Sequence, residues 1–207
     1  SLQPEIETLG QDDDILALDG NEISPLWGHT VAIGCDPGPY PDAYFAVPFI
    51  EYDDEGNVDR TLSASEIYTT AREDHACELL IVAHPYDGQA TFDYYGLEPG
   101  VDPADLEPYL DLDLVDGAEV INSHDPPEDI FTKNVPGWLD ILAHGYRLTG
   151  VGGSDEHGVG TQFGHPRNLV RVTDDATRTA LADASHGQAY VARAPFCLVF
   201  FANPARS

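Results

Sequence analysis

The stretch from Gly150 to Gly160, GVGGSDEHGVG, places an aspartate and a histidine among closely spaced glycines. Glycine lets the backbone turn tightly and approach a ligand closely. Asp155 and His157 together offer a carboxylate oxygen and an imidazole nitrogen, which are ligands that zinc, manganese and iron accept. The same pattern also fits a polar turn, with Glu156 facing solvent. The other polar residues of the chain therefore decide between a metal site and a turn.

Further candidate ligands flank other predicted strands. Glu22 closes ALDGNE, His29 opens HTVAIG, His84 ends LLIVAHP, and Asn122 and His124 end EVINSH. In α/β folds with parallel strands, functional groups gather at the carboxyl ends of the strands. A single histidine after a buried strand is more often a hydrogen-bonded wall residue, and a single acid in this chain is often solvated. The prediction therefore depends on five side chains that converge on one metal site: Glu22, His29, His84, Asp155 and His157.

Two further residues are candidates for substrate binding. His165 and Arg167 lie in FGHPRN, shortly after the D-x-H pair. An arginine at the rim of a metal site can bind a phosphate oxygen through two parallel hydrogen bonds. The simpler interpretation of Arg167 is that it neutralises neighbouring acids.

The elements that must position these residues alternate between strands and helices. Aliphatic runs predict strands over 15–24, 29–35, 78–85, 115–123, 146–155, 168–172 and 188–194, of which the last closes the domain. Helices are predicted from Ser63 to about Cys77, where SASE supplies a capping box, over 135–145 and over 174–187, with a short helical piece over 102–110. Residues 36–60 are rich in Pro, Gly and Asp and predict a surface excursion. Because Pro85 follows His84, we expect extended backbone at His84.

This order of elements predicts a single α/β domain over 1–207 with a mainly parallel sheet, either open or barrel-like. The three cysteines are widely spaced and form no C-x-x-C pattern, so the sequence predicts neither a zinc ribbon nor a disulfide framework. Cys77 and Cys197 lie in apolar surroundings and are expected to be small buried hydrophobic residues.

The chain is strongly acidic, with 37 acidic against 9 basic residues and a formal net charge of −28. Such a surface repels phosphate backbones, so we expect neither nucleic acid nor an anionic membrane as a partner. No apolar run approaches the roughly 18 residues of a membrane span, and the chain does not open on a signal peptide. The acidity is typical of adaptation to salt, as in a halophilic or marine source. Neither the compartment nor the oligomeric state follows from the sequence.

Four segments in this order, DGNEISPLWGHTVAIG, IVAHP, GAEVINS and GVGGSDEHGVGTQFGHPRNLVRV, resemble the PHP (polymerase and histidinol phosphatase) superfamily. Within it, the chain is most similar to the CehA/McbA branch of carbaryl-hydrolase-like metallohydrolases, over residues 15–195. The resemblance implies a distorted (β/α) barrel with two or three divalent ions, Zn, Mn or Fe, at the carboxyl ends of the strands.

The resemblance also implies roles for individual residues. Glu22 matches the acid of the G-x-E motif, which is often a bridging ligand, and His29 matches the histidine of the GH motif. His84 matches the histidine of AHP, and Asp155 and His157 match the pair that closes the metal site. Asn122 matches a structural or pocket-lining position, and neither it nor His124 receives a metal role.

The chain departs from the family pattern at its beginning. The family starts with a strand that ends in H-x-H, followed by a T-D-H element, and no histidine precedes Glu22 here. The chain also contains no methionine. We therefore expect the amino-terminal part of the domain to be missing, which would leave the metal site incomplete and the truncated chain itself inactive.

Together these observations predict a metal-dependent hydrolase that acts on a small molecule, either a phosphoester or an ester or carbamate. A metal-activated water would be the nucleophile, with Glu22, His29 and Asp155 as the catalytic residues. The alternative is a non-catalytic PHP-fold binding or structural domain. A serine hydrolase is disfavoured because no G-x-S-x-G motif is present.

Overall fold

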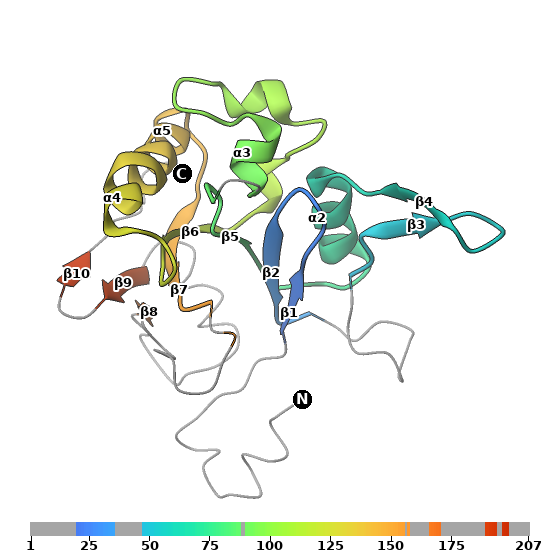
Figure 1. Ribbon diagram of the computed structural model, residues 1–207, viewed down its shortest axis with the longest axis horizontal. Coiled ribbons are helices and arrows are strands. Elements are labelled where there is room, and N and C mark those ends of the chain that lie inside the picture. Colours follow the sequence, from blue (N-terminus) through green and yellow to red (C-terminus); the bar gives the residue numbers. More distant parts are fainter. Residues whose placement is uncertain are drawn as a thin grey trace, which may run out of the picture.

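A computed structural model describes residues 20–35, 47–87, 90–155, 157, 166–170, 189–193 and 196–198 of the chain. Its centre is a five-stranded sheet in the order β1-β2-β5-β6-β7 (Figure 1). The strands are β1 (Gly20–Ile23), β2 (His29–Ile33), β5 (Leu79–Ala83), β6 (Gly117–Asn122) and β7 (Thr149–Gly153). The pairs β5-β6 and β6-β7 are parallel, and β1-β2 and β2-β5 are antiparallel. The α/β class is confirmed, but the sheet is mixed rather than mainly parallel, and the described strands form no closed barrel.

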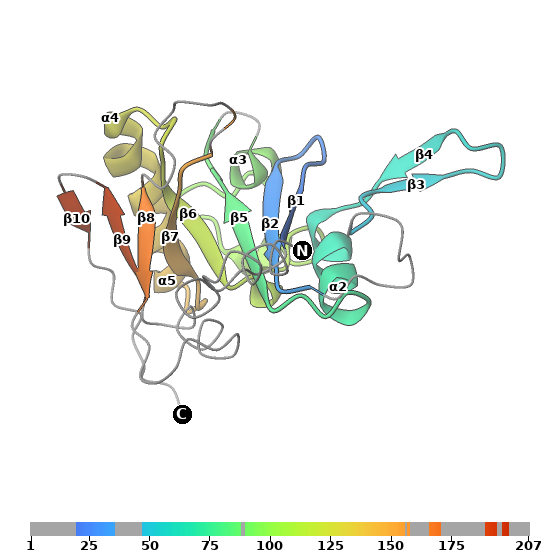
Figure 2. The ribbon, with the colours of Figure 1, turned by 90° about the horizontal axis from the view of Figure 1, so that it is seen from below.

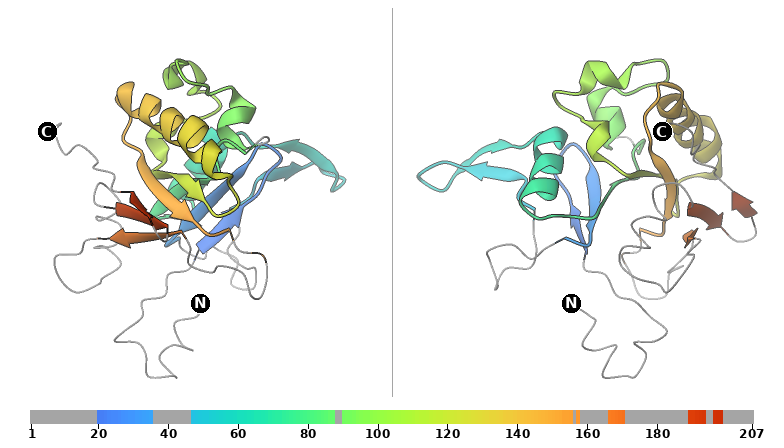
Figure 3. Two further views of the ribbon diagram at one scale, coloured as in Figure 1. Left: turned by 60° about the vertical axis from the view of Figure 1, so that its left-hand side comes forward. Right: turned by 180° about the vertical axis from the view of Figure 1, so that it is seen from behind.

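The helices pack against one face of this sheet. They are α2 (Ala64–Glu73), α3 (Thr91–Tyr95), α4 (Pro127–Asp129) and α5 (Val135–Ala143), with 3-10 turns at Pro103–Leu106 and Leu112–Leu114. The Thr30 hydroxyl of β2 lies 3.3 Å from the Tyr68 hydroxyl of α2, and Trp138 of α5 lies over Gly150 of β7. The register links Thr30 through Val82 and Ala118 to Gly150, so α2 and α5 cover the same face. Figure 3 shows the helices gathered on that side.

The other face of the sheet is less covered. Along β2, His29, Val31 and Ile33 are half-buried, whereas Thr30 and Ala32 between them are fully buried. Successive side chains of a strand point to opposite faces. His29 therefore lies on the face that the described helices leave open.

The amino terminus of α2 matches the sequence prediction. Ser63 is the N-cap, its Oγ accepts a hydrogen bond from the Glu66 N–H, and the Glu66 carboxylate accepts one from the Ser63 N–H. The helix ends at Glu73 with Asp74 as its C-cap, slightly before the predicted end at Cys77.

We expect the variant Ser63→Ala to unfold with about 1 kcal/mol less free energy than the wild type, because one end of the capping box is lost. Urea unfolding followed by circular dichroism measures this difference. Thr69→Ala, at an exposed position inside the same helix, is the control and should stay within about 0.5 kcal/mol of the wild type. Equal losses in the two variants would contradict a capping role.

The helical segment before β7 is longer than predicted. The helix predicted over 135–145 is α5, but it is preceded by α4 and a π-helical turn at Ile130–Asn134. Pro127 starts this segment, in the first turn, where a backbone N–H would have no intrahelical partner, so proline, which lacks this group, is tolerated.

Part of the predicted surface excursion is a hairpin. The strands β3 (Ile50–Tyr52) and β4 (Val58–Thr61) pair antiparallel and project away from the rest of the molecule (Figure 2). Every residue of β4 is exposed. Residues 36–46 of the excursion lie outside the described residues.

A second, three-stranded antiparallel sheet contains β8 (Arg167–Val170), β9 (Ala189–Arg193) and β10 (Phe196–Leu198). The strand β10 was not predicted, and the helix predicted over 174–187 lies outside the described residues. Asn168 joins the two sheets, since its side chain exchanges two hydrogen bonds with the backbone of Gly152 at 2.9 and 3.0 Å.

Cys35 and Cys77 form a disulfide, which the wide spacing of the cysteines in the sequence did not indicate. The strands β2 and β5 are antiparallel neighbours in which Ile33 pairs with Leu79. Cys35 follows this pair by two residues on one strand and Cys77 precedes it by two on the other, so the register itself brings them together. Both cysteines are buried, as predicted for Cys77. Among the described residues, no helix has both the length and the hydropathy to cross a membrane.

Candidate metal site at the carboxyl edge of the sheet

The ends of several strands meet at one edge of the central sheet. The carboxyl ends of β5, β6 and β7 lie there because these strands are parallel. The start of β2 lies at the same edge because β2 is antiparallel to β5, and the end of β1 joins it through a short turn. All five predicted metal ligands belong to this edge.

The first cluster contains Glu22, His29 and His84. One ligand atom from each lies within 4.8 Å of the others. His29 Nδ1 is 3.0 Å from Glu22 Oε1, and the rings of His29 and His84 meet edge to face with their centroids 4.9 Å apart. Glu22 pairs with Val31, two residues from His29, so the two side chains share one face of the sheet. His84 follows Ala83, the partner of His29.

The backbone at His84 differs from the prediction. Its φ angle is +29°, in the left-handed region, rather than extended as Pro85 suggested. Asp155 also has a positive φ, at +47°. Non-glycine residues adopt this conformation at a cost of about 1 kcal/mol or more, and such positions are concentrated at functional sites. Among the described residues only Ala76 shares it outside glycine.

The second cluster contains His124, Asp155 and His157, again with ligand atoms within 4.8 Å of one another. The Asp155 carbonyl oxygen lies 2.9 Å from His124 Nε2 and 2.9 Å from His157 Nδ1. His157 is largely exposed, whereas Asp155 is mostly covered. His124 was not predicted to bind a metal, and the structure brings it to the D-x-H pair because β6 and β7 are parallel neighbours.

The five predicted ligands thus fall into two clusters, not one. Glu22, His29 and His84 come together at the β1, β2 and β5 side of the edge, and Asp155 and His157 at the β7 side. Arg167 is the first residue of β8, and His165 lies outside the described residues.

Glu119 of β6, which was not among the predicted site residues, lies between the clusters. Its Oε2 accepts hydrogen bonds from the His84 N–H at 2.9 Å and from the Asn122 amide at 3.1 Å. Gly153 makes room for it, because a Cβ there would lie 1.7 Å from Glu119 Oε1. Burial raises the pKa of Glu119 above 4.5, the charge of Asp155 adds to this effect, and the hydrogen bonds and His84 oppose it. An acid between Ala118 and Val120 in an apolar strand was the signal available in the sequence, because glutamate is rarely buried without a partner.

Asn122 organises the polar groups around Glu119, in agreement with its predicted structural role. Besides its bond to Glu119, its side-chain oxygen accepts a hydrogen bond from the His124 N–H, and its own N–H donates to Asp125. Asp125 also accepts a hydrogen bond of 2.7 Å from the Asn134 amide, and burial raises the pKa of Asp125. The loop after β6 is therefore fixed by a network that reaches both clusters.

Imidazole nitrogens and carboxylate oxygens suit Zn, Mn and Fe, and the described part of the edge offers no thiolate that would select further. Both clusters have this donor set. In the comparison with known proteins, no family model matches the chain, and the searches of curated proteins and of solved structures found no match.

Proposed function

We propose that this chain belongs to a metal-dependent hydrolase that binds divalent ions at the carboxyl edge of the sheet. The observation that carries the proposal is the Nδ1 atom of His84, which is buried and has no hydrogen-bond partner among the described residues. A buried polar atom without a partner is rare in proteins, and a bound cation is one of the ways in which such a nitrogen is satisfied. The neighbours of His84 are His29 and Glu22, so the surroundings of its Nδ1 atom fit a cation.

The hydrogen bonds of the other histidines support the same proposal. A carbonyl oxygen only accepts, so His124 Nε2 and His157 Nδ1 each carry a hydrogen and donate a hydrogen bond to the Asp155 carbonyl. In the same way, the Glu22 carboxylate pairs with His29 Nδ1 at 3.0 Å. In each neutral ring the second nitrogen then keeps its lone pair. Metal-binding histidines have this arrangement in most sites, because the oxygen acceptor fixes the tautomer and orients the ring.

A divalent ion bound here would supply a water of lowered pKa as the nucleophile. Within this proposal Glu22 holds the proton on His29 Nδ1 and orients the ring, and Asp155 provides carboxylate oxygen beside His157. Glu119 fixes the backbone of His84 through the His84 N–H. The substrate class of the proposal is a small molecule with a phosphoester, ester or carbamate bond.

The finer assignment of the fold belongs to the same proposal. We infer that the open sheet is part of a distorted barrel of the PHP type. The support is that histidines and acids occur at the carboxyl edge in the order of that family's motifs, from Glu22 to His157.

Metal analysis of chelator-treated and then Zn- or Mn-loaded protein tests the binding step. We expect His84→Ala to lose the ion of the first cluster and an Asp155→Ala, His157→Ala double variant to lose the ion of the second. His144→Ala is the matched control, since His144 caps α5 and belongs to neither cluster. Equal metal content in the wild type and in all the cluster variants would remove the proposal.

An activity screen tests the chemical step. The metal-loaded complete domain, which includes the expected amino-terminal part, is incubated with phosphomonoesters, phosphodiesters and aryl esters. The proposal expects turnover that stops with a chelator and returns with Zn or Mn. Metal binding without any turnover would support the alternative of a binding domain with an incomplete site.

A further inference from the structure

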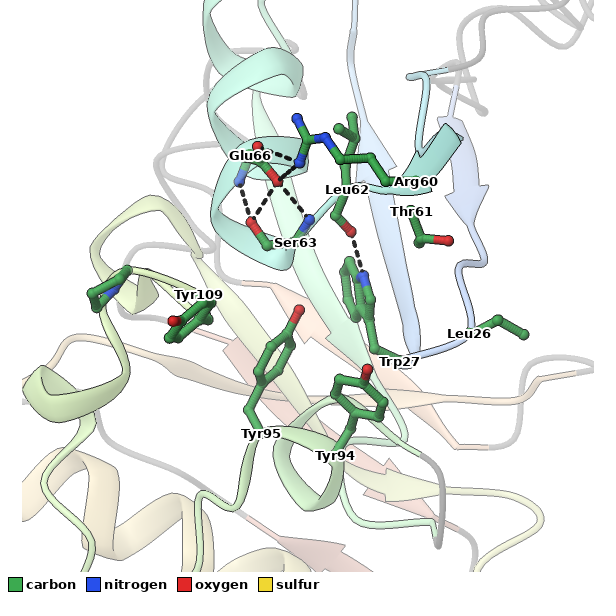
Figure 4. A pocket seen from close by; sticks show the side chains of 11 residues that line it. Leu26, Trp27, Arg60, Thr61, Leu62, Ser63, Glu66, Tyr94, Tyr95 and Tyr109 are labelled. Carbon is green, nitrogen blue, oxygen red and sulfur yellow. Dashed lines mark hydrogen bonds and ion pairs between the residues drawn. The ribbon is translucent and has the colours of Figure 1, made fainter. Parts of the chain in front are cut away.

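A pocket of about 550 Å³ opens beside the β1–β2 turn, and none of the residues that line it belongs to either cluster of candidate ligands (Figure 4). Its walls come from that turn, the end of β4, the start of α2, the helix α3 and the segment around Tyr109. A volume of this size is typical of sites for small molecules.

Aromatic rings form one side of the pocket. Trp27 and Tyr95 have ring centroids 5.8 Å apart, and Tyr94 meets Tyr95 edge to face at 5.1 Å. Tyr94 and Tyr109 are 61% and 60% exposed, so their rings are available to a ligand. Aromatic groups prefer offset or edge-to-face contacts with other aromatic rings.

Most polar groups on the opposite side already bind one another. Arg60 donates through Nε and Nη2 to Glu51 and through Nη1 to Glu66, and Glu66 also accepts from Ser63. Figure 4 draws the bonds that Glu66 makes with Arg60 and Ser63, which all line the pocket. A sugar or other polyhydroxylated ligand needs several polar partners, so it is disfavoured here.

On the aromatic side, the polar groups of Trp27 and Tyr95 are engaged as well. Trp27 Nε1 donates to the Leu62 carbonyl at 2.7 Å, and the Tyr95 hydroxyl accepts from the Ala64 N–H at 3.0 Å. The rings of Trp27 and Tyr95 are therefore fixed in place, which lowers the entropy that a ligand must remove on binding.

The charge at the pocket selects against anions. The guanidinium of Arg60 is compensated by two carboxylates, those of Glu51 and Glu66. The local sum is one negative charge, and the chain as a whole carries −28. A phosphate or carboxylate group would be repelled, although an uncharged ring would not.

We propose that this pocket binds an uncharged aromatic ring of a small molecule. The binding site is separate from the metal clusters and requires no ion, so it does not depend on the proposed hydrolase activity. Trp27 precedes His29 by two residues, which keeps their Cα atoms within roughly 7 Å. A ring in the pocket would therefore lie at the same edge of the sheet as the first cluster.

A ligand-observed NMR titration with 2-phenylethanol tests this proposal on the full chain. The matched probe is 2-cyclohexylethanol, which has the same hydroxyl and nearly the same shape without the aromatic ring. We expect saturable binding of 2-phenylethanol, weaker binding of the cyclohexyl compound, and still weaker binding of phenylacetate and of methyl glucoside. The affinity should not change after chelator treatment.

Variants locate the site. Tyr94→Ala and Tyr109→Ala should each weaken binding of 2-phenylethanol by about two- to tenfold, the range that one aromatic contact contributes. Tyr52→Ala is the control, because Tyr52 is similarly exposed but lies on the β3–β4 hairpin outside the pocket. Circular dichroism verifies that the variants fold.

The proposal fails if no saturable binding is found, or if the cyclohexyl compound binds as tightly as 2-phenylethanol. It also fails if Tyr52→Ala weakens binding as much as Tyr94→Ala, or if chelation abolishes binding. If the cluster variants lose metal binding but bind 2-phenylethanol as the wild type does, the pocket is a site separate from the proposed hydrolase site.

Discussion

Arg72→Met is expected to lower the free energy of unfolding by about 3 kcal/mol, because it leaves a buried acid without its cation. Arg72 lies at the end of α2 and donates to the Asp116 carboxylate and to the Leu114 carbonyl, which precede β6. It also donates to the carbonyls of Cys77 and Glu78, which precede β5, at 2.7 and 2.9 Å. Methionine keeps the apolar stem but makes none of these hydrogen bonds. The decrease in the free energy of unfolding therefore measures the contribution of the guanidinium group.

Arg60→Met is the matched control for this prediction. Arg60 also binds two acids, but the three side chains are between 42% and 48% exposed, and ion pairs of this kind contribute about 0–1 kcal/mol. Urea unfolding in one buffer compares the two variants. If Arg60→Met were as destabilising as Arg72→Met, the loss of stability in Arg72→Met could not be attributed to the location of Arg72 between α2 and the sheet.

Local patterns were enough to predict most elements that support the candidate site. The strand around Leu80, the capping box at Ser63 and the strand that leads to Asp155 depend on neighbours close in sequence, and the structure confirms all three. A continuous apolar run or a capping motif carries its own information, because the interactions that stabilise it are made within a few residues.

Features that depend on strand register were not predictable in this way. The disulfide follows from the antiparallel pairing of β2 with β5, whereas mainly parallel strands were expected from the sequence. The division of the candidate ligands into two clusters has the same origin. His29 lies beside the end of β5, whereas Asp155 lies two strands away at the end of β7. Residue types at strand ends indicate a common edge, and the strand order decides which of them meet.

The aromatic pocket and the first cluster meet at the turn between β1 and β2. Gly28 lies against the backbone of Thr91, where a Cβ would come within 2.4 Å of the Thr91 nitrogen, so the turn and the start of α3 are in close contact. This contact positions Trp27 toward the pocket on one side, and His29 begins the strand on the other. An aromatic ring bound by Tyr94 and a cation bound by His84 would thus lie on the two sides of the short turn between β1 and β2.

Glu119→Gln is expected to make the stability of the protein less sensitive to pH above 4.5. The pKa of Glu119 is raised in the folded chain, mainly by burial, so the folded state keeps a proton that the unfolded state has already lost. Between pH 4.5 and the folded pKa the folded state therefore binds more protons than the unfolded state. In this window the contribution of Glu119 to stability falls as the pH rises, by at most about 1.4 kcal/mol for each pH unit.

The glutamine variant lacks this titration but has an oxygen that can accept the His84 N–H. The free energy of unfolding of the variant minus that of the wild type should therefore increase as the pH rises from 4.5, in chelator-treated protein at constant salt. Glu66→Gln should change with the opposite sign and below pH 4.5, between the folded pKa of Glu66 and 4.5, because the Ser63 N–H lowers the pKa of Glu66. Wild-type Glu66 contributes stability above pH 4.5 that is lost as the pH falls through its folded pKa. Parallel pH profiles for the two variants would mean that the burial of Glu119 between the two clusters does not control its charge.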